Sequence, residues 1–201
     1  MAQRGETKSR VRRTAAELFR RRGYHGTAIN QILDQSGAPA GSLYFHFPGG
    51  KTELAIEAVT AAGGEIGRGI EYLLESSEDV AEAVGRVVDF LAGDLRQSDY
   101  EHGCPVGSVA LDVASTSEPI RVACRTIFDD WTAKIARRLR TAGWTRKAAV
   151  EEALVIVALI EGALLLARAS RDIAPLNAVA SHLRTTLSNP PSPRTAKRSG
   201  A

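Results

Sequence analysis

Cysteine is scarce in this chain, with only Cys104 and Cys124 among its 201 residues. Two cysteines this far apart form neither a metal-ligand pattern nor a disulfide framework, so the sequence predicts no metal site and no disulfide-stabilised fold. Long apolar runs are also missing, and the longest, residues 153–160, is far too short to cross a bilayer. The N-terminus is too polar for the apolar segment of a signal peptide. We therefore expect a cytoplasmic protein with no membrane contact.

The patterns of β-structure and of common enzyme classes are missing as well. No segment alternates apolar and polar residues as a half-buried strand does, and there is no internal repeat. We find no nucleophile beside a base, no paired carboxylates and no HExxH at convincing spacing. Residues 48–51 (PGGK) are too short for a phosphate-binding loop, which needs GxxxxGK[ST] after a strand. The sequence predicts an all-α protein that is not an enzyme and needs no cofactor.

Net charge is small, but its distribution is uneven. The formal net charge is only +3, whereas residues 1–22 contain eight basic and two acidic side chains, so the rest of the chain is slightly acidic. A basic N-terminal module on an acidic body is typical of a DNA reader joined to a separate sensor. The alternative interpretation is a solvated helix face.

Residues 27–54 form a helix–turn–helix pattern. Thr27 is the expected N-cap of a first short helix, because its hydroxyl can accept a hydrogen bond from a free backbone N–H. Apolar residues then recur at spacings of three and four until Gly37, which suits the left-handed C′ position. Pro39 suits the first position of a second helix, predicted over residues 39–47. Two helices joined this tightly cross steeply.

The second helix has small and polar residues where an amphipathic helix would carry an apolar face. Leu43 and Phe47 are expected to point inward, and Phe45 to pack on the flank. Small outward residues let the backbone approach base edges, whereas hydroxyl, imidazole and ammonium groups suit phosphate oxygens. The outward set, with the cation that follows it, is Ala40, Gly41, Ser42, Tyr44, His46 and Lys51. Similar turns also occur in all-α proteins that bind no DNA.

A block longer than the turn carries a dense pattern. It contains residues 15–19 (AAELF), Gly23-Tyr24, Gly26-Thr27, Ile32-Leu33, Ser36-Gly37, residues 41–47 (GSLYFHF), Lys51 and Glu53-Leu54. This pattern resembles the N-terminal signature of TetR-family transcriptional regulators. Residues 47–51 (FPGGK) and 103–107 (GCPVG) resemble a subgroup that includes LmrA and YxaF. The first resemblance covers roughly the first quarter of the chain, and beyond it only the all-helical layout carries over.

The resemblance implies a role for each matching position. Phosphate contacts would come from Thr27, Tyr44, His46 and Lys51, and Ala40, Gly41 and Ser42 would face the bases. Asn30 lies on the exposed side of the first short helix and would reach the edge of the groove. Ala40 and Gly41 carry no polar side chain, so DNA shape or the basic N-terminus would supply part of the specificity.

The rest of the chain reads as helices. We expect a loose arm over residues 1–6 and a first helix over 7–22. A long linking helix over 51–74 contains four glycines, which mark either a soft section or close packing. Further helices are predicted over 77–95, 105–114, 117–141, 145–171 and 175–187. The predicted domains are residues 1–50 for DNA binding, 51–188 for ligand binding and dimerisation, and 189–201 as a disordered tail.

The apolar pattern of one predicted helix indicates that the protein forms a homodimer. Residues 154–166 are apolar almost all round, interrupted only by Glu161, so this helix must be buried on two sides. We expect residues 154–168 and 179–187 to form a four-helix interface, with Val179, Leu183 and Leu187 completing it. The alternative is the central helix of a monomeric bundle. A two-fold dimer would place two recognition helices in successive major grooves, roughly 34–36 Å apart.

An all-α body with a long linking helix also predicts a ligand pocket between helices. The candidate lining residues are Phe90, Cys104, Phe128, Trp131, Ile135, Leu159 and Glu161, although each would also suit an ordinary core. Glu161 needs a partner among so many apolar residues, and this partner is either a ligand, for which Glu161 would be the polar anchor, or Arg125 or Arg168. The sequence thus predicts a repressor that binds double-stranded DNA and is released by a small-molecule inducer. An architectural DNA protein and a small all-α enzyme are the alternatives.

Overall fold

The structure is a computed structural model that describes residues 2–188, with side chains from residue 5 onward. Every element in this range is an α-helix, so the predicted all-α class is confirmed. The helices are α1 (Ala2–Arg22), α2 (Ile29–Ser36), α3 (Ser42–His46), α4 (Gly50–Glu75), α5 (Val80–Gln97), α6 (Pro105–Val113), α7 (Glu118–Thr141), α8 (Arg146–Ser170) and α9 (Ala174–Leu187). The tail predicted for residues 189–201 lies outside the described residues.

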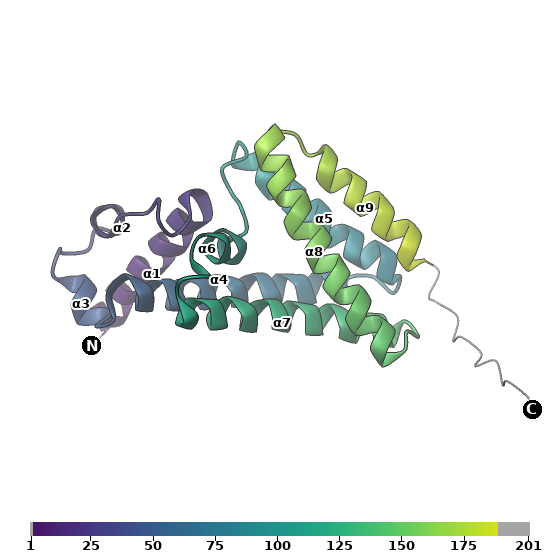
Figure 1. Cartoon of the computed structure of the whole chain (residues 1–201), viewed down its shortest axis with the longest axis horizontal. Helices are drawn as coiled ribbons and strands as arrows, with labels where there is room; N and C mark the ends of the chain where they lie inside the picture. Colours follow the sequence, from purple (N-terminus) through teal and green to yellow (C-terminus); the bar gives the residue numbers. More distant parts are fainter. Residues whose placement is uncertain (1, 189–201) are drawn as a thin grey trace, which may run out of the picture.

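The long helices α4 and α7 lie side by side along the molecule (Figure 1). Helices α1–α3 form a head at one end, and α5, α8 and α9 form a bundle toward the other end. The short helix α6 contacts α1, α4 and α7, so it lies between the head and the body. No helix of the described range is long and apolar enough to cross a membrane.

Several helix ends lie where local chemistry predicts them. Gly37 ends α2 with φ of 62°, the left-handed conformation that glycine adopts at low cost. The Asp79 carboxylate caps α5 by accepting from the Ala81 N–H at 2.8 Å. The Thr145 hydroxyl caps α8 by accepting from the Ala148 N–H at 3.3 Å. Each cap satisfies a backbone group that the first or last turn leaves free.

Two predictions about the head are wrong. Helix α1 begins at Ala2, so residues 2–6 are helical rather than a loose arm. Thr27 is not the N-cap of α2, because Ala28 occupies that position and makes no side-chain cap. The Thr27 hydroxyl is buried and donates instead to the carbonyl oxygen of Gly23 at 2.8 Å. This hydroxyl therefore stabilises the turn that follows α1 instead of capping α2.

The second helix of the helix–turn–helix pattern is shorter than predicted. Helix α3 begins at Ser42, and Pro39 lies in the turn before it rather than at the first helical position. The Pro39 carbonyl accepts from the Ser42 N–H at 2.8 Å, which closes a tight turn instead of an α-helical one. The Ser42 hydroxyl donates to the same carbonyl at 2.7 Å and stabilises that turn. Ala40 and Gly41 thus lie in a turn at the front of the helix.

The buried apolar residues form two cores. One joins the head to α6 and α7, and it contains the predicted inward residues Val11, Ala15, Leu18 and Phe19. The other lies between α5, α8 and α9, with a contribution from α7. The head core therefore continues across residue 50, where the sequence predicts a domain boundary, because side chains of α6 and α7 complete it. The division into domains stays a prediction.

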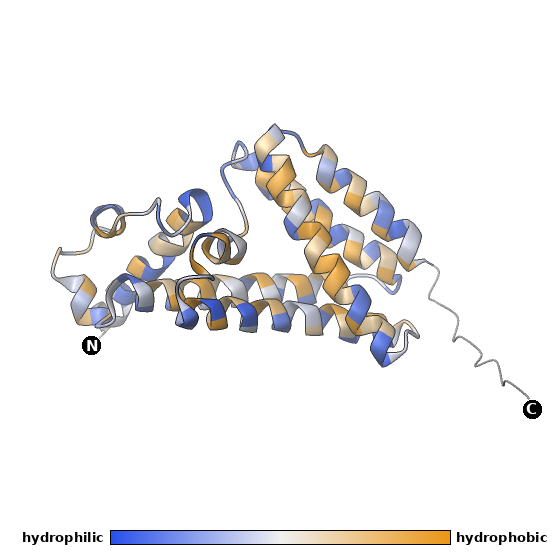
Figure 2. Cartoon of the chain, viewed as in Figure 1, coloured by the Kyte–Doolittle hydropathy of each residue, from blue (hydrophilic) through white to orange (hydrophobic). Residues whose placement is uncertain are grey.

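Helix α8 carries apolar residues along most of its length (Figure 2). Leu154, Leu165 and Leu166 are 61%, 56% and 60% exposed, so one apolar side of this helix faces outward. The α9 residues predicted to extend that surface do not lie on it. Leu183 and Leu187 are buried in the core of the same chain, and Val179 packs against it, because α9 lies along α5.

Candidate nucleic-acid interface and cavity

The inward side chains of α3 determine which residues it exposes. Leu43 and Phe47 are fully buried in the head core, and they hold the opposite side of this short helix toward solvent. Tyr44 is 65% exposed, as a phosphate contact requires. Phe45 is 61% exposed, and its ring contacts the His46 imidazole rather than the buried core of the head.

The remaining predicted DNA contacts differ in exposure. Asn30, Ala40 and Gly41 are exposed, whereas Ser42 and His46 are half-buried. The imidazole of His46 lies edge-on between the rings of Phe45 and Phe47, with ring centroids 4.9 and 6.4 Å away. Thr27 is buried behind these residues, so its family-implied phosphate contact would need the turn around Gly23 to open.

Lys51 makes contacts within the head that the sequence does not predict. Its ammonium group donates to the carbonyl oxygen of Tyr24 at 2.6 Å and lies 4.3 Å from the centre of the Tyr24 ring. Burial lowers the pKa of Lys51, and the nearby Asp112 carboxylate opposes that shift. The side chain therefore joins the start of α4 to the turn that follows α1.

Basic side chains of α1 add positive charge to the head. Lys8 pairs with Glu57 at 2.7 Å, and Arg10 donates to the Ser36 carbonyl at the end of α2, 3.2 Å away. Arg12, Arg13 and Arg22 make no ion pair with any residue that the structure describes. Unpaired guanidinium groups near a helix–turn–helix are available to neutralise phosphates.

A cavity of about 700 Å³ lies between the head and the body. Five of the seven predicted residues line it, namely Phe90, Cys104, Trp131, Ile135 and Glu161. Phe128 and Leu159 do not. The Phe128 ring packs edge-on against Trp131 at 5.5 Å, and Leu159 packs against the core between α5, α8 and α9. Apolar side chains of α4, α5, α7 and α8 make up nearly half of the lining residues.

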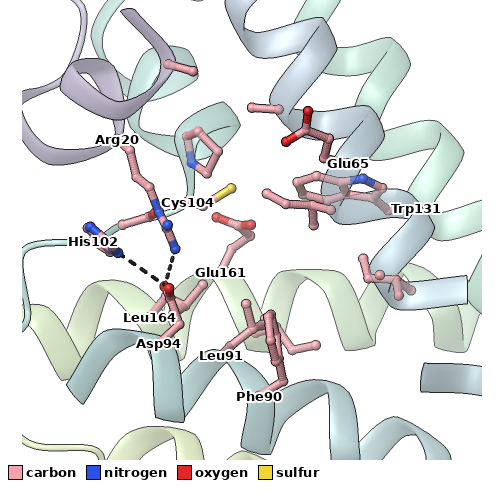
Figure 3. Close-up of a pocket in the computed structure, with 18 of the residues that line it drawn as sticks. Arg20, Glu65, Phe90, Leu91, Asp94, His102, Cys104, Trp131, Glu161 and Leu164 are labelled. Carbon is pink, nitrogen blue, oxygen red and sulfur yellow. Dashed lines mark hydrogen bonds and ion pairs between the residues drawn. The ribbon is translucent and has the colours of Figure 1, made fainter. Parts of the chain in front are cut away.

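Neither Arg125 nor Arg168 pairs with Glu161, so that predicted alternative is wrong. Arg125 pairs with Asp129 at 3.4 Å, and Arg168 donates to the carbonyl oxygens of Arg21 and Glu101. The Glu161 carboxyl instead lies beside the Cys104 thiol (Figure 3). Burial raises the pKa of Glu161, and the Cys104 hydrogen bond opposes this shift.

Cys104 caps α6 rather than acting as an activated thiol. Its sulfur accepts from the Gly107 N–H at 3.3 Å at the start of that helix. Burial, followed by the nearby Glu161 charge, raises the pKa of Cys104 well above its usual range. A thiol with a raised pKa carries little thiolate at neutral pH, so this cysteine is suited to packing and capping.

Part of the cavity lining belongs to the head and was not predicted from the sequence. Arg13, Thr14, Ala16, Glu17 and Arg20 of α1 all line the cavity. These residues read locally as a basic, amphipathic helix, and no local pattern indicates that one side of it closes a cavity against residues about 80 positions later. An occupant of the cavity would therefore touch α1 of the head directly.

Comparison with known proteins gives the family. Residues 11–58 match the family described as "Bacterial regulatory proteins, tetR family", and residues 80–182 match "Transcriptional regulator LmrA/YxaF-like, C-terminal domain". YxaF of Bacillus subtilis, an HTH-type transcriptional regulator, is 38% identical over 183 residues that cover 91% of this chain and 96% of YxaF. The chain belongs to the TetR family of transcriptional regulators.

Solved structures of the TetR family share this fold. A TetR regulator from Chloroflexus aurantiacus is 29% identical and aligns with a TM-score of 0.81, over 94% of this chain and 98% of its own. A cysteine-substituted CifR, complexed with 26-bp operator DNA, aligns with a TM-score of 0.74 at 21% identity, over 91% and 96% of the two chains. The second likeness shows the fold alone.

Proposed function

We propose that this TetR-family regulator is a repressor that binds a pseudo-palindromic operator as a homodimer and leaves it when a small molecule fills the cavity. One observation carries this proposal: α1, the first helix of the reading head, lines the cavity together with α4, α5, α7 and α8. A ligand that prefers one position of α1 over another changes the position of α3 on DNA. Coupling of roughly 1–3 kcal/mol would weaken operator binding by about 5- to 150-fold.

The reading role is assigned to the front of α3 and its preceding turn. Ala40 and Gly41 are exposed and small, so the backbone can come close to base edges, and Ser42 follows them at the start of the helix. Tyr44 and His46 would contact phosphates, with Asn30 at the groove edge and Lys51 at the start of α4. CifR was solved with operator DNA, and the same fold here supports a comparable use of the head.

The dimer is assigned to the outward side of α8 with the outward residues of α9. Leu154, Leu165 and Leu166 are large, apolar and exposed, and the small residues Ala158 and Gly162 between them would let a second helix approach closely. The outward side of α9 carries small and polar residues, since its leucines are used within the chain. Two-fold pairing of α8 would bury these leucines and place two heads on one face of DNA. Such a regulator acts where the chromosome is, in line with the predicted cytoplasmic location.

A gel-shift titration against fragments of the source genome tests this function. The repressor is supported if a few fragments are retained at protein concentrations that leave bulk DNA free. Uniform retention would indicate an architectural DNA protein, and no retention would contradict DNA binding altogether. Addition of small-molecule extracts to the retained complex then tests for release.

A further inference from the structure

The loop between α5 and α6, residues 98–104, is held between the head and α8. Asp99 and Tyr100 both have positive φ, 52° and 64°, which L-residues adopt only when their surroundings hold them there. Arg171, at the end of α8, pairs with Asp99 at 2.6 Å and lies over the Tyr100 ring at 5.6 Å. The start of the loop is therefore fastened to α8.

The other end of the loop is fastened to α1 by a reciprocal pair of hydrogen bonds. The Gly103 N–H donates to the Arg20 carbonyl at 3.3 Å, and the Arg20 Nε donates to the Gly103 carbonyl at 2.8 Å. A Cβ on residue 103 would stand 2.6 Å from Arg168 Nη1 and 2.9 Å from Ser108 Oγ. The backbone at Gly103 is thus enclosed by side chains of α6 and α8 while it bonds to α1.

Charged side chains add to this junction. The Arg20 guanidinium pairs with Asp94 of α5. The His102 imidazole lies between two carboxylates, with Nε2 3.0 Å from Glu17 and Nδ1 3.4 Å from Asp94. Figure 3 shows Asp94 joined to both Arg20 and His102 at one end of the cavity. Arg21 extends the network by pairing with Glu17 at 2.7 Å and with Glu101 at 3.0 Å.

All the members of this junction that line the cavity form what we call the latch, which consists of Glu17, Arg20, Asp94, His102 and Gly103. Isolated surface ion pairs contribute little to stability, about 0–1 kcal/mol. The latch is a partly buried network that joins α1 to α5 and to a loop, so its effect would be on the position of α1. Arg20 also lies in the last turn of α1, immediately before the turn that leads to α2.

We propose that Asp94 and His102 are positioning residues that hold α1 in the DNA-reading position, and that an occupant of the cavity weakens operator binding by breaking their contacts with Arg20 and Glu17. The inference rests on the proposed function, since it assigns the path by which the cavity acts on the head. On the far side of the same turn, Lys51 and Asp112 hold Tyr24 and the His25 N–H. Release of the latch would therefore let the end of α1 pivot about these contacts.

A group attached covalently to Cys104 can occupy the cavity, so this experiment does not require the natural ligand. Cys104 lines the cavity beside the latch, and the second cysteine, Cys124, is buried and is replaced in a Cys124→Ala parent. Because the raised pKa of Cys104 leaves little thiolate at neutral pH, the label is attached at raised pH and the protein is returned to neutral pH before binding is measured. Benzyl methanethiosulfonate then transfers a benzylthio group to the Cys104 thiolate, forming a disulfide and releasing methanesulfinate. Mass spectrometry checks that one label is present, and the methyl reagent provides a small control.

Operator binding is measured with and without the label in the parent, in an Asp94→Asn/His102→Gln variant and in Glu151→Gln. Glu151 forms an exposed pair with Lys147 at 3.8 Å and lies outside the cavity, so it serves as the control. We expect the benzyl label to weaken binding by the parent and by the control about tenfold or more, within the range typical of allosteric coupling. The latch variant should bind weakly before labelling and change less than about twofold afterwards. Equal weakening in all three proteins would overturn the latch while leaving the proposed function intact.

Amide hydrogen exchange gives a second readout that needs no DNA. The label and the Asp94→Asn/His102→Gln change should each speed exchange in the last turn of α1, with little further effect in combination. Exchange in the last turn of α7, where Arg138 donates to the Leu74 and Ser77 carbonyls at the far end of α4, should stay unchanged. Unaltered protection of α1 in the labelled parent would contradict the inference even if no operator were found, whereas a chain without sequence-specific binding would contradict the proposed function.

Discussion

Gly63 of α4 and Ile127 of α7 pack so closely that residue 63 has no room for a side chain. A Cβ on Gly63 would stand 2.5 Å from Cγ2 of Ile127, and the Gly63 carbonyl accepts from the Trp131 indole N–H at 2.9 Å. The glycines of α4 were expected to mark either a soft section or close packing. At Gly63 the reason is close packing, since Ile127 of α7 occupies the space that a side chain would need.

The first prediction separates close packing from helix propensity at neighbouring positions. Gly63→Ala should lower the free energy of unfolding by about 1–3 kcal/mol, because Ile127 must move in a filled core. Gly64→Ala is the matched control, since its Cβ would meet only Arg68 at 3.8 Å. It should raise the free energy of unfolding by up to ~1 kcal/mol through helix propensity. Urea denaturation of both variants checks the signs, and the same sign for both would show that Gly63 is not a packing position.

The second prediction separates the charge of Lys51 from the hydroxyl of Tyr44 in operator binding. Lys51→Met should weaken binding to all sequences. It should also reduce the slope of log affinity against log salt by about 1, because one cationic side chain that contacts a phosphate is lost. Tyr44→Phe should weaken binding without altering that slope, since the side chain is uncharged. Fluorescence anisotropy at several salt concentrations measures both quantities.

Lys147→Met is the control for Lys51→Met, because Lys147 is exposed at the start of α8, away from the head. It should leave the slope as it is in the parent. Lys51→Met also removes the bond to the Tyr24 carbonyl, so circular dichroism must show that the head remains folded. An unchanged slope in a folded Lys51→Met protein would remove Lys51 from the phosphate contacts.

The third prediction concerns the pH dependence of stability at Glu161. Burial raises the pKa of Glu161 above its ordinary value of 4.5, so the folded state favours the protonated carboxyl. The stability that this group contributes is therefore fully present below about pH 4.5 and is lost as pH rises through the raised pKa. Glu161→Gln cannot titrate, so it should melt progressively higher than the parent as pH increases from 4 to 8.

Thermal melts at several pH values measure this difference, and Glu151→Gln gives the baseline for an exposed carboxylate. The melting-temperature difference between Glu161→Gln and the parent should grow with pH, whereas that of Glu151→Gln should not. A difference that stays constant across this range would show that the Glu161 carboxyl is ionised in the folded chain without penalty.

The fourth prediction concerns the dimer. Leu165→Glu places a charge in the middle of the outward side of α8, and the cost of burying it unpaired should give a monomer in sedimentation velocity. Leu111→Glu on α6 is the control, since Leu111 is 77% exposed and lies outside the proposed interface. The control should remain dimeric. A dimeric Leu165→Glu protein would mean that another surface joins the subunits.

Much of the fold follows from local chemistry in the sequence. Asp79, Thr145 and Gly37 lie at helix ends because their side-chain or backbone properties suit those positions wherever they occur. The head formed by α1–α3 was equally predictable from the sequence, because its motif is short and dense. Thr27 was misplaced because its hydroxyl is held in a buried turn by the Gly23 carbonyl, which helix propensity does not reveal.

The cavity was predictable only in part. Trp131 and Glu161 stand out in sequence as an aromatic and a charged residue on apolar helices, and both line it. The latch was not predictable, because Arg20 and Asp94, or Glu17 and His102, lie more than 70 positions apart in the sequence and are joined only by ion pairs in the folded chain. Leu183 and Leu187 were assigned to the dimer because periodicity shows that a helix has an apolar side without showing what covers it.

Nuclease footprinting of the full chain on a retained genomic fragment tests the central claim most directly. The account predicts two protected half-sites related by two-fold symmetry, with centres one helical turn apart, roughly 34–36 Å, or a whole number of turns. The sequence of each half-site should match the other when read on opposite strands. A single unsymmetrical footprint, or protection spread evenly along the fragment, would contradict it.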